Sequence, residues 1–456
     1  MLNKTKIGIL LLLFLGRQPP LQAQRVYAAN SVLATGNWIK IGIKQAGVYK
    51  IDAASIASMN LAAGSIGSAS IKLFGNGGAM LPEPNAQFRN DDLVENAIEV
   101  VDGGDGIFSG NDYLLFYANG PHQWLKDSLN KQFNHVKNLY ADTAYYYLNI
   151  GGTGKRLNTK TAPVNSNTVV NSFNERYFYE NDLVNLQNSG KEWLGESFSS
   201  NGSLAKTFSI DWPGMIAPVT LKTSVAARSI NSASSFAIQM NGQTIMNINI
   251  PAVSGYFLDA YALAGNDNKS SNVSSTPISL NYTYQSTVAG AEGWLNWFEL
   301  QGRKSLIMNG TNQLPFRDWA SVAAGNIAKF TISNTTANTN IWDITNPLNP
   351  EKINGSLLGS DCVFLADASQ LREYIAFDKT NVFIPVSTQK ISNQNLHQSS
   401  VADYIIVTDA SFISAANQLA AFHTQQDQYR TVEQLPNKFF KNFLAVFQTQ
   451  QPLEIL

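Results

Sequence analysis

The chain has 456 residues, which is long for one hydrophobic core and predicts two or three domains. Hydrophobic residues make up 44% of it, enough for folded cores, whereas charged residues make up only 14%, against roughly 25% in an average soluble protein. The formal net charge is −1 and no basic run occurs, so the composition excludes a protein that binds nucleic acid.

The N-terminus has the pattern of an export signal. Lys4 and Lys6 form a short positive region, and the apolar stretch that follows at 7–15 is too short to span a bilayer. Ala23 supplies a small residue before the expected cleavage point, so we predict a signal peptide at 1–23. No later stretch reaches the roughly 18 apolar residues of a membrane helix. We therefore expect an exported protein with no transmembrane helix after signal removal.

Residues 24–160 follow a β pattern and predict an N-terminal β-rich domain. At 39–43, isoleucines alternate with lysine and glycine, which predicts a strand with one buried face. The short link at 45–47 predicts a hairpin between this strand and a second strand at 48–51. Further strands rich in aromatic and branched residues are expected at 70–74, 113–117 and 145–150.

A second β-rich region, at 170–348, predicts a domain like a β-sandwich or jelly roll. Asn241 and Gly242 lie between strand patterns at 236–240 and 244–250, which predicts a tight hairpin. Alternating strands with turns between them, as expected here, are typical of such sandwiches. We expect the residues at 349–400 to form a connecting region.

From residue 401 the spacing of apolar residues changes. The run at 404–407 predicts a strand buried on both faces, and Thr408 with Asp409 can cap a helix at 411–425. The apolar positions at helical spacing are Phe412, Ala415, Leu419 and Phe422. A strand followed by a helix opens an α/β domain, but we expect no second parallel strand to complete the βαβ unit. The overall prediction is a mainly β protein that ends, at 401–456, in the truncated start of an α/β domain.

One glycine-rich loop has the residue types of a calcium site. It contains Asp102, Asp105 and Asp112, and glycines let carboxylates turn inward on a hard cation. Gly104 and Gly106 stand where an EF-hand loop needs oxygen ligands, so the spacing does not fit that motif. Solvated turns are also rich in Asp and Gly, which is the alternative interpretation.

Other residues with reactive side chains give no recognisable site. Asp91 and Asp92, with Glu95, have the residue types of acid–base catalysis, and a solvated charged loop is the alternative. Cys362 lies in an apolar run between acidic residues, which favours a buried core position over a nucleophile. The histidines have no metal-binding spacing; they are His122, His135, His397 and His423.

A group of large aromatic residues has the composition of a carbohydrate-binding platform. These residues are Trp193, Trp294, Trp297, Tyr282 and Tyr284. Large aromatic side chains also fill the cores of β-sandwiches, which is the alternative interpretation. We therefore assign no catalytic, cofactor-binding or metal-binding residue from these patterns, and we expect no cofactor.

Several segments, in this order, resemble the type IX secretion system sortases, the PorU-type members of the gingipain family of cysteine peptidases. The segments are 73–83, 91–97, 110–117, 120–122, 140–142, 145–146, 190–196, 316–318, 393–397 and 403–408. The resemblance covers about 32–434. The last segment is similar to the first strand of the gingipain catalytic domain.

The resemblance implies a protein of the periplasm, outer membrane or cell surface. Such a protein works with other type IX secretion components, removes C-terminal sorting signals from secreted cargo and joins the cargo to a lipopolysaccharide anchor. Its catalytic pair is a histidine and a cysteine, activated as a thiolate and an imidazolium. Neither Cys362 nor any histidine of this chain matches those positions. The resemblance therefore implies an inactive chain with no catalytic residue of its own.

The last residues, 448–456, suggest a shifted reading frame. One permitted set of codons, read one base earlier, encodes Pro-Asp-Pro-Thr-Ala-Ile-Arg-Asp-Phe, which resembles the segment expected here in gingipain-type peptidases. The hypothesis is that the chain is the N-terminal portion of a sortase. The alternative is a non-enzymatic, exported adhesion or secretion-accessory protein built from the β domains.

Overall fold

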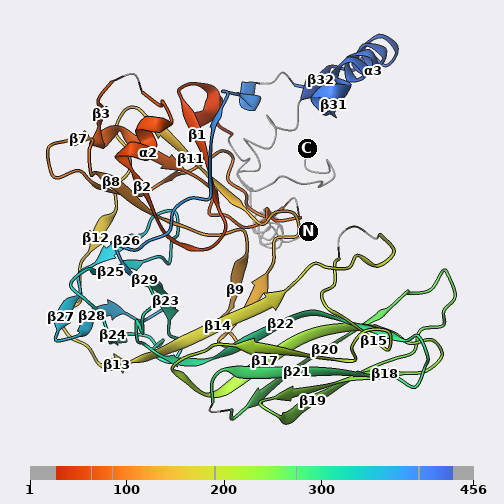
Figure 1. The fold of residues 1–456 in the computed structure, drawn as a ribbon. Helices are drawn as coiled ribbons and strands as arrows, with labels where there is room; N and C mark the ends of the chain where they lie inside the picture. The colour runs from red at the N-terminus through yellow and green to blue at the C-terminus, as the bar shows by residue number, and fades with distance from the viewer. Residues whose placement is uncertain are drawn as a thin grey trace, which may run out of the picture.

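The structure is a computed structural model that describes residues 27–434 except 63, 85, 189, 191, 274, 399 and 400. It is mainly β, as the sequence predicts, and three pairs of packed sheets account for most of it (Figure 1). A small strand–helix–strand unit stands apart from these sheets (Figure 1). No helix in the described ranges has both the length and the apolar character needed to cross a membrane.

The first pair of sheets contains most of the N-terminal residues. One sheet has five strands in the order β30 (Ser387–Ile391), β1 (Trp38–Ile43), β11 (Ala144–Ile150), β4 (Ile71–Phe74) and β5 (Glu95–Asn96). The other has β2 (Gly47–Asp52), β8 (Tyr113–Ala118) and β6 (Glu99–Val101). Short elements complete this region: η1 (Val32–Ala34), α2 (Ala53–Ser58), β3 (Ile66–Gly67), η2 (Ser68–Ser70) and β7 (Ile107–Phe108). Isoleucines of β1 and aromatic residues of β8 and β11 share one core between the sheets.

The predicted hairpin between 39–43 and 48–51 is wrong. Both segments are strands, but β1 pairs with β11 on one edge and β30 on the other, whereas β2 pairs with β8 in the second sheet. Because both edges of β1 are occupied, β2 has no free edge of β1 to join. The short link therefore carries the chain from one sheet to the other.

The second pair of sheets is a β-sandwich, as predicted. One sheet has β14 (Ser172–Glu180), β22 (Glu292–Ser305), β17 (Met215–Arg228) and β20 (Leu263–Ser271), with β15 (Ser197–Ser199) also on β22. The other has β16 (Ala205–Ile210), β21 (Ile278–Gln285), β18 (Ser234–Met240) and β19 (Gln243–Ile250). η3 (Leu186–Asn188) precedes β15. The predicted hairpin at Asn241 and Gly242 is confirmed: both have positive φ, as a type I′ turn requires, and they join β18 to β19.

The third pair of sheets is built from two distant parts of the chain. Its first sheet has β12 (Asn158–Lys160), β26 (Glu351–Ile353), β25 (Thr339–Asp343), β29 (Glu373–Asp378) and β23 (Gln313–Arg317). Its second has β13 (Thr168–Val170), β24 (Ile327–Ile332), β28 (Asp361–Asp367) and β27 (Ser356–Leu358). The stretch 349–400, expected as a connection, thus contributes strands to three sheets. Where the domains begin and end stays a prediction.

The last unit consists of β31 (Tyr404–Val407), η5 (Ala410–Phe412), α3 (Ile413–Gln426) and β32 (Thr431–Gln434); η4 (Leu396–Gln398) precedes it. β31 and β32 pair in parallel, so the expectation that no second parallel strand follows the helix is wrong. Asp403 and Arg430 fix the start of both strands through hydrogen bonds of 2.7 and 2.6 Å. β32 forms by backbone pairing with β31, although it lacks the continuous apolar run that is typical of buried parallel strands.

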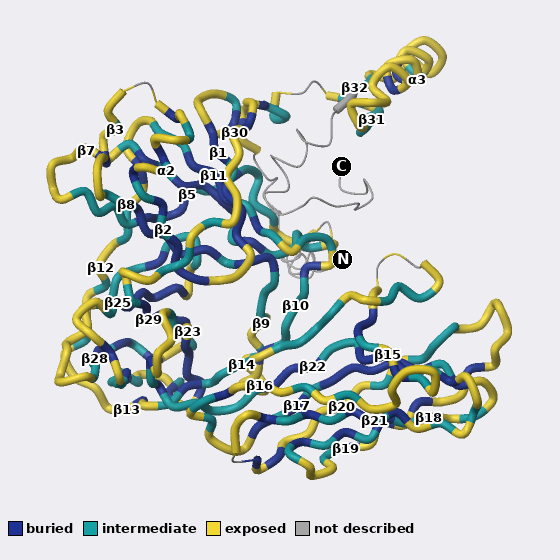
Figure 2. Tube along the Cα trace, in the orientation of Figure 1, coloured by how far each residue is buried: buried dark blue, intermediate teal, exposed yellow. Residues whose placement is uncertain are grey.

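The expected apolar face of the late helix is also wrong. The helix is confirmed as α3. Asp409 caps the short η5 before it, because its side chain accepts a hydrogen bond from the backbone N–H of Ser411, whereas α3 itself has no side-chain cap at Phe412. However, α3 buries Ala416 and Ala420, whereas the predicted apolar positions are all exposed. β31 is only half-buried along its length. Figure 2 shows the contrast between this exposed unit and the dark interiors of the paired sheets.

Candidate functional site

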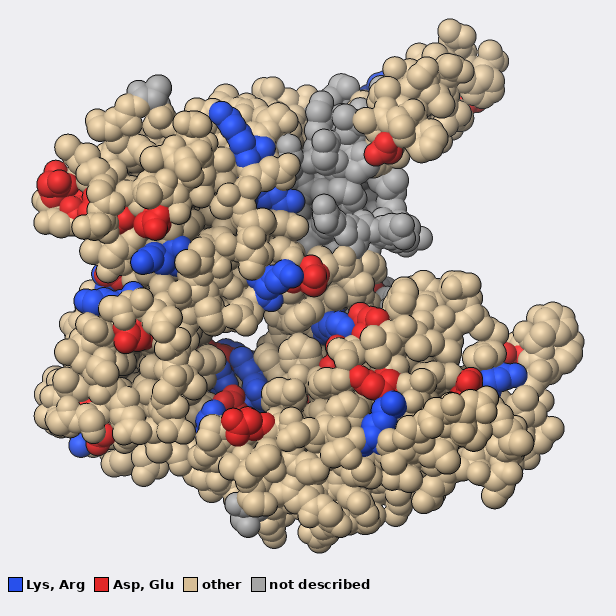
Figure 3. Space-filling view, in the orientation of Figure 1, with Lys and Arg blue, Asp and Glu red and all other residues tan. Residues whose placement is uncertain are grey.

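The most elaborate polar contacts in the described residues lie where three parts of the fold meet. A two-stranded arm, β9 (Gln123–Asp127) and β10 (Gln132–Val136), extends from the first pair of sheets to the sandwich. We call this hairpin the arm (Figure 1). On the face shown in Figure 3, basic and acidic side chains gather around a hollow between the upper and lower parts of the molecule. In contrast, the sandwich surface in that view carries few charges.

His135 of the arm bridges two carboxylates of the sandwich. Its Nδ1 lies 2.5 Å from Oε1 of Glu299, and its Nε2 lies 2.6 Å from Oε2 of Glu180. The backbone N–H of His135 donates to the same Oε1 of Glu299, at 2.9 Å. The two glutamates come from β22 and β14, so one imidazole ring holds the arm to neighbouring strands of one sheet. Only 4% of the His135 side chain is exposed.

Aromatic rings surround this imidazole. Phe178 stacks on it with ring centroids 4.8 Å apart, and Trp297 and Trp124 meet it at steep angles. These rings exclude water, so the contacts of His135 with the carboxylates are stronger than at an exposed position. Burial alone lowers the pKa of His135, but the hydrogen bonds to Glu180 and Glu299 outweigh it and raise the pKa. Burial raises the pKa of Glu299, but its bonds with His135 outweigh that effect and lower it.

A second ionic group ties the arm and the sandwich to the third pair of sheets. Glu373 of β29 accepts hydrogen bonds from Arg176 of β14 at 3.2 and 3.1 Å and from Arg317 of β23 at 3.2 Å. Lys126 of the arm lies 3.8 Å from the same carboxylate. Burial and repulsion from Arg317 lower the pKa of Arg176 to about 10. Four strands from three parts of the fold therefore converge on one carboxylate.

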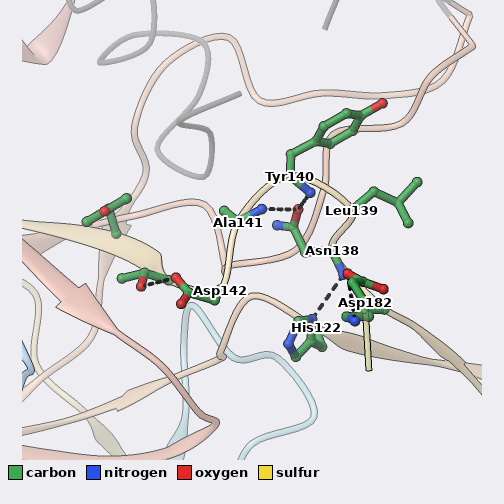
Figure 4. Close-up of a pocket in the computed structure, with 10 residues that line it drawn as sticks. His122, Asn138, Leu139, Tyr140, Ala141, Asp142 and Asp182 are labelled. Carbon is green, nitrogen blue, oxygen red and sulfur yellow. Dashed lines mark hydrogen bonds and ion pairs between the residues drawn. The ribbon is translucent and has the colours of Figure 1, made fainter. Parts of the chain in front are cut away.

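A pocket of about 410 Å³ lies at the base of the arm (Figure 4). His122, Lys137 and Asn138 line it from the two ends of the arm, and Asp182 lines it from just beyond β14. Nδ1 of His122 accepts a hydrogen bond from the backbone N–H of Asn138 at 3.0 Å, so its proton is placed on Nε2. Burial, and then Lys137, lower the pKa of His122. The pocket therefore presents a neutral imidazole N–H beside an ion pair between Lys137 and Asp182.

The buried amide of Asn138 holds the loop that forms one pocket wall. Its Oδ1 accepts hydrogen bonds from the backbone N–H groups of Tyr140 and Ala141, at 3.0 and 3.1 Å (Figure 4). Its Nδ2 has no hydrogen-bond partner in the described part of the chain. A buried amide with an unused donor is unusual in folded proteins. The wall is thus fixed by one side of the amide, and the other side adjoins the pocket.

Two segments that are far apart in the sequence form a clasp around residues 28–33. Asp91 accepts from the backbone N–H of Ala28, and Asp92 accepts from that of Val32, at 2.7 and 2.6 Å. From the segment after β30, Asn395 accepts from the backbone N–H of Ser31 at 2.8 Å. His397 of that segment places Nδ1 2.6 Å from the carbonyl oxygen of Ala28. The clasp therefore connects the start of the described chain to the linker that leads into the last unit.

Replacing Asp92 with alanine is expected to loosen the clasp while the paired sheets stay folded. The variant loses hydrogen bonds with Val32 and Ser31, which cost about 1–3 kcal/mol to leave unmade where a donor is buried. Hydrogen exchange by mass spectrometry should show faster exchange at 28–34 and 393–398, and at Leu93, whose backbone N–H also donates to Asp92. Asp211→Ala, at an exposed carboxylate just after β16, provides the control. Unchanged exchange at both segments in Asp92→Ala would show that the clasp contributes nothing.

The acidic residues considered in the sequence have structural partners in the described residues. In the glycine-rich loop, Asp102, Asp105 and Asp112 each accept a hydrogen bond from a backbone N–H two or three residues away. These bonds form the turns of the loop itself. Glu95 accepts from the backbone N–H of Lys155 at 2.7 Å. Across the described ranges, no three His, Cys, Asp or Glu side chains gather in a way that could hold a metal ion.

The aromatic residues that could have formed a carbohydrate-binding platform do not come together on one surface. Tyr282, Tyr284 and Trp294 are buried in the sandwich, Trp297 packs against His135, and Trp193 lies apart in the loop before β15. The alternative interpretation, that these rings fill cores, is the correct one for the buried residues. The predicted position of Cys362 is confirmed: it lies on β28 with 6% of its surface exposed. Burial raises the pKa of its thiol.

Two predictions fall outside the described residues. The signal peptide at 1–23 and the shifted reading frame at 448–456 both lie there.

His423 lies in the last turn of α3, and its Nδ1 is 2.6 Å from Oδ2 of Asp427.

The sequence did not predict the residues that join the arm, the sandwich and the third pair of sheets, a contact region that we call the junction. These are His135, Glu180, Glu299, Arg176, Arg317 and Glu373. One signal was present: Glu299 lies between Phe298 and Leu300 inside a strand pattern, and charged residues are almost never fully buried unless they are paired. That signal marks a buried charge, but it does not identify the partner.

The sequence matches no family model and no curated protein. Among solved structures, the fold resembles dimeric latent PorU from Porphyromonas gingivalis, with a TM-score of 0.76 and 21% sequence identity. The similarity covers 92% of this chain and 39% of that one, so this chain spans well under half the length of that protein. A carbohydrate-binding module CBM36 in complex with calcium and xylotriose reaches a TM-score of only 0.19, which is too low to indicate a shared fold.

Proposed function

We propose that this chain serves as the non-catalytic front part of a PorU-type sortase of the type IX secretion system. The observation that supports this proposal is the likeness in fold to PorU over 92% of the chain. The ordered sequence segments that resemble the gingipain family point in the same direction. In this role the chain acts at the periplasmic side of the outer membrane or at the cell surface. Its partners are other type IX secretion components and cargo with C-terminal sorting signals.

The chemistry of the described residues supports a scaffold role rather than catalysis. A cysteine peptidase needs a thiolate activated by a nearby base. Cys362 is buried in the core of the third pair of sheets, among phenylalanine side chains, and its raised pKa keeps it a thiol. His135 is held by two carboxylates in a different part of the fold. These residues hold elements together instead of facing a substrate.

The purified chain is expected to leave a peptide with a C-terminal sorting signal uncleaved. The reason is that the buried thiol of Cys362 cannot act as the nucleophile. Product formation is measured by mass spectrometry after prolonged incubation, with the Cys362→Ser variant in parallel. Cleavage by the native chain that is absent in Cys362→Ser would refute the non-catalytic role.

A binding experiment tests the proposal that the chain associates with other type IX secretion components. A tagged copy of the chain, purified from the envelope of its own bacterium after cross-linking, should recover other type IX secretion components. A Glu373→Ala variant, in which the junction is disrupted, is purified in parallel. It shows whether recovery of the components depends on the native arrangement of the three parts of the fold. If the native chain recovers none of these components, the alternative of an independent exported adhesion protein is favoured.

A further inference from the structure

The arm meets the sandwich through a histidine, whose unperturbed side chain titrates near neutral pH. An unperturbed histidine changes charge between about pH 5 and 8, and His135 is the group of this kind at the contact. Its two ring nitrogens face carboxylate oxygens of Glu299 and Glu180, at 2.5 and 2.6 Å. Carboxylates only accept hydrogen bonds, so both nitrogens must donate for both contacts to be favourable. Only the protonated ring has two N–H groups.

Charged groups on every packed element surround this bridge. From β17, Lys222 donates to Asn134 of the arm at 2.5 Å and lowers the pKa of Glu299. Gln301 of β22 donates to the second oxygen of Glu299 at 3.0 Å. Lys137, next to the arm, donates to the backbone oxygen of Glu180 at 3.1 Å. Lys222 thus favours the charged form of Glu299, and Lys137 holds the backbone of β14 at Glu180.

Further groups approach from β14 and from the base of the arm. The Arg176 guanidinium lies 4.6 Å from the centroid of the Phe133 ring and 5.3 Å from that of Trp124, both on the arm. His122 meets the edge of Phe178, whose ring stacks on His135. His122 has a lowered pKa and is the second titratable group on this face of the junction.

We propose that His135 makes the arm a pH-dependent latch: the arm is held against the sandwich while the imidazole is protonated and loosens when it is not. Loss of the proton leaves one ring nitrogen with a lone pair that faces a carboxylate oxygen. The buried carboxylate then loses its compensating charge, which is costly in a site that water does not reach. This inference concerns a movement within the chain and does not depend on the proposed function.

The sign of the effect follows from the direction of the shift. The pKa of His135 is raised in the folded state, so its contribution is complete below the pKa of a free histidine and is lost as the pH rises through the raised value. The pKa of Glu299 is lowered, so its contribution is lost only when the pH falls through that lowered value. The latch is therefore closed in the weakly acidic to neutral range and loosens in alkali.

Loosening of the arm changes the pocket at its base. His122, Lys137 and Asn138 belong to the arm or directly flank it, whereas Asp182 follows β14 of the sandwich (Figure 4). The ion pair between Lys137 and Asp182 spans the two sides at 2.8 Å. Movement of the arm away from β14 separates these walls and widens the pocket. The latch thus couples external pH to the shape of this pocket.

The distance between the arm and the sandwich tests the proposal in the full chain. Spin labels are attached at Leu129→Cys, in the turn of the arm where the side chain is 91% exposed, and at Asn268→Cys on β20. The native Cys362 is buried and stays unlabelled. Double electron–electron resonance is recorded at several values between about pH 6 and pH 10, which bracket an unperturbed and a raised histidine pKa.

We expect one narrow distance at the acid end and a growing second, longer population at the alkaline end. The ratio of the short-distance to the long-distance population falls about tenfold for each pH unit between the pKa of the histidine in the loosened arm and its pKa in the docked arm. His135→Gln is expected to have the longer population at every pH, because its side chain cannot bridge two carboxylates as a cation. His122→Gln, at a ring that meets the edge of Phe178, is the matched control and keeps the native response. Near-ultraviolet circular dichroism of each variant verifies that the rest of the fold is native.

Two results would overturn the latch. The first is a distance distribution of the native chain that does not change between the two ends of the pH range. The second is a His135→Gln variant, folded by circular dichroism, that keeps the native pH response. Either result would mean that the bridge is a static contact.

Discussion

Replacing Glu373 with alanine is expected to lower the free energy of unfolding by about 3–5 kcal/mol, because it leaves buried cations without their partner. Arg317 and Arg176 both donate to this carboxylate, and Arg317 is almost fully buried. Without Glu373, the two guanidinium groups repel each other in a site that excludes water. Chemical denaturation followed by fluorescence measures the loss.

The pH dependence of this loss has a definite sign. Burial raises the pKa of Glu373, but Arg317 and Arg176 outweigh it and lower the pKa below that of a free glutamate. The stabilisation is therefore present above the unfolded pKa and is lost as the pH falls through the lowered value. The difference between native chain and Glu373→Ala should shrink under acid conditions.

An exposed ion pair provides the control for Glu373. Asp427 pairs with His423 at 2.6 Å on the surface of the last unit. Its replacement with alanine is expected to change stability by no more than about 0.5 kcal/mol. A loss of the same small size in Glu373→Ala would contradict the view that this carboxylate joins three parts of the fold.

Replacing Phe316 with alanine is expected to cost about 3–5 kcal/mol, the usual range for removing a buried phenylalanine ring. Phe316 is fully buried on β23, and its ring stacks on Tyr374 with centroids 5.3 Å apart. It also contacts rings from three other strands: Phe173 of β14 in the sandwich, and Phe330 and Phe364 of β24 and β28 in the third pair of sheets. The cavity cannot close without displacing several of these rings, so the cost stays high.

A phenylalanine on the surface provides the control for Phe316. Its replacement removes the same ring without removing any packing in the core. Phe257 is 80% exposed in the loop between β19 and β20. Phe257→Ala is expected to change the unfolding free energy by no more than about 0.5 kcal/mol. Equal denaturation midpoints for Phe316→Ala and the native chain would contradict the position of Phe316 in the core.

Phe316, Arg317 and Asp318 illustrate what a sequence segment does and does not reveal. The segment is one of those that resemble the gingipain family, and the resemblance assigns it no role. In the structure, Phe316 fills the core, Arg317 reaches Glu373, and Asp318 accepts from Arg303 and from the backbone N–H of Ser321. All three side chains are buried. The role of this segment is structural, and only its distant partners make that visible.

The sequence by itself determined the β class, the positions of several of the longer strands, the tight turn at Asn241 and Gly242, and the burial of Cys362. These features depend on the alternation of side chains along one strand and on local φ values, which neighbouring residues set. The position of α3 and the Asp409 cap of η5 are equally local. For the same reason, the β sandwich was recognisable from its strand pattern.

The tertiary structure alone decided which strands pair and which charges meet. β1 could not pair with β2 because β11 and β30 occupy its two edges, and β30 lies more than 300 residues further along the chain. β32 formed from a segment without an apolar run because β31 offered it an edge. His135 meets Glu180 and Glu299 across 45 and 164 residues. Contacts over such separations depend on how whole sheets pack, and no local pattern of residues encodes them.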